Sequence, residues 1–127
     1  MSVVFATGSA SVAGTSETAI VSSQPTNGIN LQGLGMKISG MINFSGNASA
    51  STVTLKVRQG TGTSGTVVWT SPALTVAAAA VAQLPYEAQD LVQGVATYTL
   101  TATFSAAPAV ATVNGTITLT DAGYSAD

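Results

Sequence analysis

Alternation of apolar and polar side chains with a period of two is the feature that most constrains the fold of this 127-residue chain. In the segment STVTLKVRQ, Val53, Leu55 and Val57 share one parity, and threonines and cations hold the other. Successive side chains on a strand point to opposite faces, so this pattern predicts one buried face and one face turned outward. The same pattern recurs in MKISGMINF, ATYTLTATF and VNGTITLT.

Weaker strand signals separate or flank these four segments, and clusters of Gly, Ser, Asn and Pro between them favour turns. They cover residues 3–7, 17–23, 66–70, 73–82 and 85–90. Short strands at such spacing predict an all-β fold: a single-domain antiparallel β-sandwich, jelly-roll-like, with about eight short strands. One segment stays open between strand and helix, because the alanines at 77–80 favour helices. Its place between strand signals favours a strand.

The length fits one domain, and no linker or repeat divides the chain. We expect the sandwich to span residues 17–122. Residues 1–16 are small and rich in polar side chains, and we expect a flexible or swapped N-terminal arm there. Residues 123–127 are expected to form a loose C-terminal tail.

Charged residues are unusually few: 6% of the chain, against about 25% in a typical soluble domain. No apolar run approaches the roughly 18 residues of a membrane span, and the N-terminus lacks the basic start of a signal peptide. We therefore expect a soluble protein, much of whose surface is covered by partners.

The net charge of −2 and the three cations argue against partners that carry phosphate. Lys37, Lys56 and Arg58 cannot form the basic footprint that nucleic acid requires. No basic amphipathic stretch suits a membrane surface either. Nucleic acid and membrane are thus not expected as partners.

The absence of Cys and His restricts the chemistry of the chain. Without Cys there is no disulfide and no thiolate metal site, and without His the usual general base and commonest metal ligand are missing. No D-x-D-x-D-G calcium loop occurs. We expect no metal and no cofactor.

A glycine motif in the stretch VRQGTGTSGTVVW matches G-x-G-x-x-G, the pattern of a dinucleotide-binding loop, at Gly60, Gly62 and Gly65. That site requires a helix after the glycines, whose N-terminus holds the pyrophosphate. Here the β-branched TVVWT follows and Pro72 soon interrupts it, which indicates a strand. We interpret the glycines as a connection between two strands that supplies positive φ angles.

The carboxylates include one close pair, Glu87 and Asp90, which we expect to be solvated rather than catalytic. A Ser–Lys pair with Lys37 or Lys56 is formally available as a nucleophile, but Lys56 lies on the polar face of a strand, which favours a surface role. Pairing of Lys56 or Arg58 with Glu87 or Asp90 at a buried interface stays open.

Three Asn-x-Ser/Thr sequons are expected by chance in a chain so rich in Ser and Thr: Asn43, Asn47 and Asn114. The scattered aromatics Trp69, Tyr86, Tyr98 and Tyr124 could form a sugar-binding platform, but core or interface positions are favoured.

The segments ETAIVSS, MKISGMINFSGNASASTVTLKVRQGTGTSGTVVW, LTVAAAAVAQLPYEAQD and ATYTLTATF resemble a group of small β-rich structural proteins from tailed bacteriophages. The resemblance covers residues 17–119, and the block TVTLKVRQGTGTSGT is its most specific part. It implies a jelly-roll domain, usually a homotrimer, that decorates the capsid or caps a fibre. Gln59 stands where the family has its second basic residue after the strand.

The resemblance and the low charge together predict a non-enzymatic virion protein. We expect a capsid decoration (cement) protein that trimerises on the outer surface of the head, binds the major capsid protein and stabilises the shell. The alternative is a receptor-binding knob of a phage fibre. We expect the chain to be complete at 127 residues, and it contains no heptad or Gly-X-Y shaft, which favours decoration. The residues expected at a subunit or capsid interface are Val3, Val4, Phe5, Lys56, Arg58, Trp69 and Tyr86.

Overall fold

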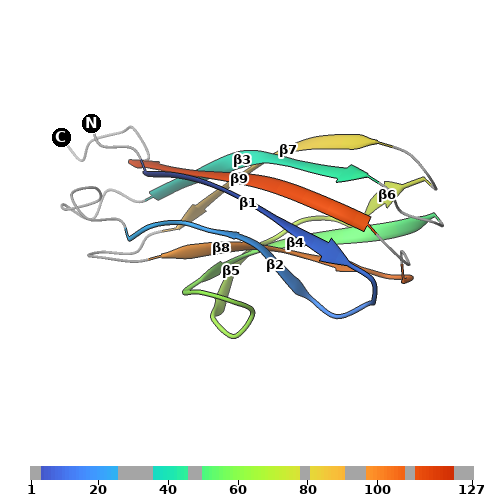
Figure 1. Ribbon diagram of the computed structural model, residues 1–127. Helices are drawn as coiled ribbons and strands as arrows, with labels where there is room; N and C mark the ends of the chain where they lie inside the picture. Colours follow the sequence, from blue (N-terminus) through green and yellow to red (C-terminus); the bar gives the residue numbers. More distant parts are fainter. Residues whose placement is uncertain are drawn as a thin grey trace.

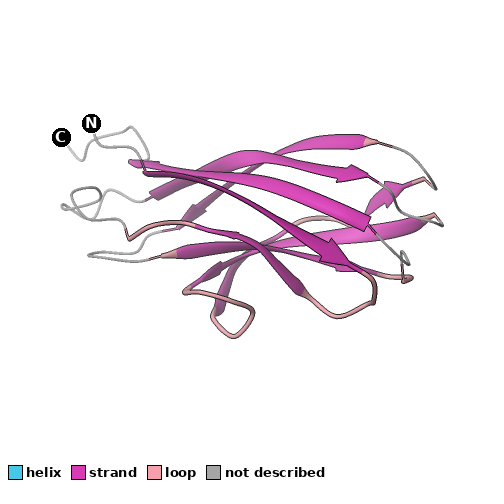
Figure 2. Cartoon of the chain, in the orientation of Figure 1, coloured by secondary structure: helices cyan, strands magenta, loops and turns pink. Residues whose placement is uncertain are grey.

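The computed structural model describes residues 4–25, 36–45, 50–77, 81–90, 97–107 and 111–121. In these ranges the regular structure consists of strands, with no helix (Figure 2). It follows that no helix there is long and apolar enough to cross a membrane. The nine strands are β1 (Val4–Val12), β2 (Thr18–Ser22), β3 (Met36–Ser45), β4 (Ser51–Gln59), β5 (Thr66–Thr70), β6 (Leu74–Val76), β7 (Ala82–Asp90), β8 (Tyr98–Phe104) and β9 (Ala111–Asp121).

The strands form two antiparallel sheets packed face to face (Figure 1). Sheet A has the order β1-β9-β3-β7, and sheet B has the order β2-β8-β4-β5, with the short β6 also paired to β4. Apart from β6, the strands thus pair from the two ends of the chain inward: β1 with β9, β2 with β8, β3 with β7 and β4 with β5. This is the order of a long hairpin rolled into two sheets, which is a jelly roll. The predicted all-β jelly-roll-like sandwich is confirmed.

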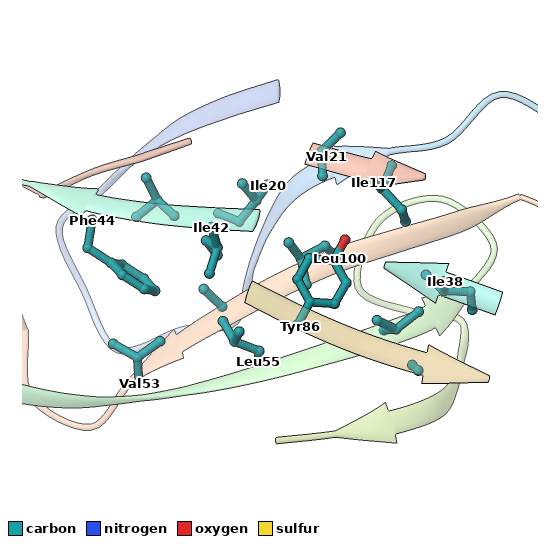
Figure 3. Packing of buried hydrophobic residues seen from close by; sticks show 14 of the residues in the cluster. Ile20, Val21, Ile38, Ile42, Phe44, Val53, Leu55, Tyr86, Leu100 and Ile117 are labelled. Atoms are coloured by element: carbon teal, nitrogen blue, oxygen red, sulfur yellow. The ribbon is translucent and has the colours of Figure 1, made fainter. Parts of the chain in front are cut away.

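The core lies between the sheets and is filled by the parity that the sequence marks as apolar. Val53, Leu55 and Val57 of β4 are at most 1% exposed. Side chains of β3 meet them from the opposite sheet (Figure 3). Phe44 of β3 packs edge-to-face on Phe104 of β8, with 6.0 Å between ring centroids, and so joins the two layers.

The N-terminal segment expected as a flexible arm contains β1, whose nine residues pair with β9 from Val4↔Leu119 to Val12↔Ala111. Alternation explains this placement: Val4, Ala6, Ala10 and Val12 pack toward the core, while Phe5, Thr7, Ser9 and Ser11 are exposed. The small size of these side chains, which suggested an arm, instead suits an edge strand that crosses close to β2.

The middle of the chain differs in detail from the expected segments. The segment 73–82 contributes only β6 before β7 begins, and residues 78–80, on which the choice between helix and strand depends, lie outside the described residues. Pro85 lies within β7, at an edge of sheet A, where a residue without an N–H is tolerated. The expected C-terminal tail, 123–127, also lies outside the described residues.

Candidate functional site

The glycine stretch connects β4 to β5 as a hairpin. Gly60 and Gly62 have φ angles of 112° and 77°, so the prediction that glycines supply positive φ here is confirmed. The Gly60 N–H donates to the Thr97 carbonyl at 2.8 Å, and the Thr99 hydroxyl donates to the Gly60 carbonyl at 2.7 Å. The loop is therefore bound to β8 of sheet B, and a strand follows it where a phosphate site would need a helix.

Arg58 and Glu17 form a bidentate ion pair on the outer face of sheet B. The Arg58 Nε and Nη2 atoms donate to the two Glu17 carboxylate oxygens at 2.7 and 2.8 Å, and Nη1 donates to the Gly65 carbonyl at 2.6 Å. The Thr101 hydroxyl adds a bond of 2.6 Å to Glu17. We call these residues — Glu17, Arg58, Gly65 and Thr101 — the Glu17–Arg58 clamp. It ties the start of β2 to β4, β8 and the glycine hairpin.

The clamp holds its carboxylate in the charged form. The hydrogen bond from Arg58 is the main cause that lowers the pKa of Glu17 to about 2, against the opposing effect of burial. Glu17 in turn raises the pKa of Arg58. Their side chains are only 19% and 15% exposed. A carboxylate this acidic and this well bonded holds the structure together and is unsuited to general acid–base work.

Pairing of Lys56 or Arg58 with Glu87 or Asp90 at a buried interface stays a prediction, and within one chain Arg58 and Glu87 have other partners. Arg58 bonds to Glu17, which the sequence analysis left without a role. Glu87 lies 3.9 Å from Lys37 in an exposed pair, which contributes little to stability. Asp90 is not simply solvated, since it accepts a bond of 2.8 Å from the Tyr98 hydroxyl.

Two aromatic residues expected at an interface meet between the sheets, at the edge formed by β5 and β7. Trp69 stacks on Tyr86 with 6.1 Å between ring centroids and 26° between ring planes. Tyr86 is 6% exposed, burial raises its pKa, and its hydroxyl donates to the Thr116 carbonyl at 2.7 Å. The part of the pair that a partner could touch is therefore Trp69, which is partly exposed.

Of the residues predicted to lie at an interface, Val4 and Phe5 belong to β1 of sheet A. Phe5 is 59% exposed on β1, and Val4 is partly buried against the core. Val3 lies outside the described residues, and Lys56 lies on the opposite sheet, on β4. The interface role of all seven residues stays a prediction. Two of them, Trp69 and Tyr86, are in contact with each other.

A hollow of about 420 Å³ lies on the outer face of sheet A, between β1, β9 and β3. Its lining offers hydroxyls, amides and backbone groups, with no charge, so it can hydrogen-bond a neutral surface but cannot move protons. The lining residues are Thr7, Gly8, Ser9, Asn43, Asn114, Gly115 and Thr116. In the part of the chain that the structure describes, no group of three or more acidic side chains is placed to hold a metal ion.

The fold and these surfaces define a jelly-roll β-sandwich whose outer faces carry few charges. No protein-family model matches the chain, and no curated protein sequence matches it. Among solved structures, it superposes on a chain of the T13 viral particle of infectious bursal disease virus (IBDV) with a TM-score of 0.64. That match has 10% identity and covers 95% of this chain and 32% of the viral one.

A chain of the IBDV Gx strain gives a TM-score of 0.60 at 14% identity and covers 98% of this chain and 34% of that one. A subunit of the disulfide-linked pili of Bacillus endospore appendages superposes more weakly, at a TM-score of 0.45 and 18% identity, over 93% of this chain and 86% of that one. The chain thus spans about a third of the length of the two viral chains. With sequence identities this low, the structural similarity establishes a shared fold and nothing more.

Proposed function

We propose that this chain is a virion structural protein, a decoration (cement) protein that trimerises on the outer surface of a tailed-bacteriophage head and binds the major capsid protein. The observation that carries the proposal is the jelly-roll superposition on IBDV chains over 95–98% of this chain. The resemblance of the block TVTLKVRQGTGTSGT to phage structural proteins supports the tailed-phage assignment.

The surface chemistry supports a role in assembly. Because only 6% of the residues are charged, a protein partner that covers an outer face would desolvate few ions. The Glu17–Arg58 clamp links β4 and β8 to the start of β2, and such links reduce the conformational entropy that a subunit loses on binding. The mechanism would be mechanical: the trimer bridges neighbouring capsid subunits and resists their separation.

Light scattering and capsid binding test the proposal. The purified protein should have the mass of a trimer, and it should raise the melting temperature of undecorated heads. A chain that neither binds heads nor stabilises them is not a cement protein. Adsorption to host cells without binding to heads would instead identify a receptor-binding knob.

A pair of matched variants locates the contact. Phe5→Glu adds a charge to the outer face of sheet A, where the side chain is 59% exposed. Val81→Glu makes the same change at a side chain that is 81% exposed just before β7, at the opposite edge of sheet A. We expect only Phe5→Glu to weaken binding to heads. Equal loss in both variants would argue against the surface around Phe5 as the contact.

A further inference from the structure

The sheet edges differ in how they are protected against pairing with another chain. At one edge of sheet A, β7 carries Pro85 and the exposed Glu87, both of which oppose the addition of a strand. In sheet B, β2 is five residues long and its pairing shifts register between Ala19 and Val21, and β5 is equally short and irregular. At the other edge of sheet A, β1 has nine residues and no charge, Pro or register shift.

Among the described residues, none pairs its backbone with the outward side of β1. In the described ranges β1 makes no backbone hydrogen bond beyond its ladder with β9. Its outward-facing side chains Phe5, Thr7, Ser9 and Ser11 are all exposed. Figure 1 shows β1, in dark blue, with β9 beside it in sheet A and no strand of that sheet beyond it.

The backbone groups that face this free edge follow from the neighbouring ladder. The Thr116 carbonyl points from β9 toward β3, because it accepts from Tyr86 and lies against Gly40. In an antiparallel ladder the N–H and C=O of one residue point to the same side. Thr7 is paired with Thr116, so its own backbone groups point away from β9. By alternation, residues 5, 7, 9 and 11 present their N–H and C=O groups to the open edge.

We propose that β1 pairs antiparallel with β1 of a second copy of this chain, around a two-fold axis at Gly8. Gly8 is the central residue of β1, so this register pairs all nine residues. Thr7 faces Ser9 of the second copy, and Phe5 faces Ser11. The residues with free backbone groups then bond to each other, and outward side chains meet outward side chains on a continuous eight-stranded sheet.

Self-complementarity argues for a second copy over an unrelated segment. The inward residues of β1 near the axis are small, Ala6, Gly8 and Ala10, so two sandwiches can approach closely at this point. The strand is uncharged, so no like charges oppose each other across the axis. The neutral hollow that includes Thr7 and Ser9 flanks the axis and supplies more hydroxyls to the junction. This contact goes beyond the proposed function and requires neither a capsid nor a trimer.

Cysteine pairs test the register, because the native chain has no Cys. A mixture of Thr7→Cys and Ser9→Cys chains should form disulfide-linked dimers under mild oxidation, since directly opposed residues lie about 5.5 Å apart. Each variant alone should crosslink far less, because its cysteines are diagonal neighbours beyond the reach of a disulfide. A mixture of Thr7→Cys with Ser11→Cys is the mismatched control. Equal crosslinking in all samples, or none in the first mixture, would overturn the register.

A proline variant tests the contact itself by sedimentation. Ser9→Pro removes an N–H group that faces the open edge. The preceding residue is Gly8, and a glycine tolerates a proline after it. We expect the mass of the native protein to rise with concentration, twofold where the basic unit is a monomer, and Ser9→Pro to abolish that rise with an unchanged melting temperature. Ala10→Pro, which removes an N–H bonded to β9, should instead destabilise the fold. A concentration-dependent rise in mass that persists in Ser9→Pro refutes the proposal. Because the readout is the rise and not the absolute mass, the test applies to a monomeric and to a trimeric basic unit.

Discussion

The Tyr86 hydroxyl donates a hydrogen bond to the Thr116 carbonyl at 2.7 Å, reaching across Gly40 from β7 to β9. Tyr86 is the residue paired with Gly40, and a side chain at position 40 would lie against both the Thr116 carbonyl and the Tyr86 hydroxyl. The Met41 N–H donates to the Thr116 hydroxyl at 2.9 Å. Side-chain bonds therefore satisfy the backbone where the β3–β9 ladder is interrupted.

Gly40→Ala should destabilise the protein by about 1–3 kcal/mol, because the added methyl group forces the three strands apart. Chemical unfolding monitored by circular dichroism measures the loss. Gly14→Ala is the matched control, since nothing lies within 4 Å of a methyl group there. We expect the control to change the free energy of unfolding by less than about 0.5 kcal/mol. Equal effects of the two substitutions would show that Gly40 is not a point of close approach.

Tyr86→Phe should cost about 1–3 kcal/mol of unfolding free energy, because the Thr116 carbonyl would lose its hydroxyl donor in a buried position. The ring stays, so the stack on Trp69 should survive. Trp69 is the only tryptophan, and its emission maximum reports this directly. A large red shift in the folded variant would mean that the hydroxyl positions the ring, contrary to this expectation.

The Glu17–Arg58 clamp should make the stability of the fold depend on pH in the acid range. The pKa of Glu17 is about 2 in the folded protein and near 4.5 in the unfolded chain. A lowered pKa stabilises the folded state fully above about pH 4.5, and this contribution is lost as the pH falls toward 2. Glu17→Gln should therefore lower the melting temperature at pH 7 and show a smaller further loss between pH 5 and 2 than the native protein.

Glu87→Gln provides the control for that pH series, because its carboxylate belongs to an exposed pair at 3.9 Å. Such a pair contributes about 0–1 kcal/mol. The acid profile of this variant should follow that of the native protein. If Glu17→Gln and Glu87→Gln have the same profile, the clamp is not the source of the acid dependence.

Alanine substitutions in the glycine hairpin should lower the free energy of unfolding by different amounts. Gly62→Ala should cost about 1–2 kcal/mol, because φ is 77° with open space around it and the penalty is conformational alone. Gly65→Ala should cost more, since its methyl group would meet the Gln59 carbonyl and displace the carbonyl that Arg58 binds. Thermal unfolding measures the melting temperature of each variant. A lower melting temperature for Gly62→Ala than for Gly65→Ala would contradict the clamp geometry.

The sequence alone determined which side chains face the core, because strand geometry is local: a period of two puts Val53, Leu55 and Val57 on one face whatever the strand pairs with. It likewise determined that Gly60 and Gly62 sit in a turn between strands. From these, the class of fold could be predicted.

Contacts between distant segments settled which strands are neighbours, and with them which surfaces form. Glu17 and Thr101 are 84 residues apart, and no local pattern links them. Alternation predicts that Thr101 faces outward, yet it is fully buried, because Glu17 and Arg58 lie over it. The same long-range pairing placed β1 at an edge of sheet A, so a segment expected as an arm became the unprotected strand. Periodicity assigns a side chain to a face, but contacts between segments distant in the sequence decide what covers that face.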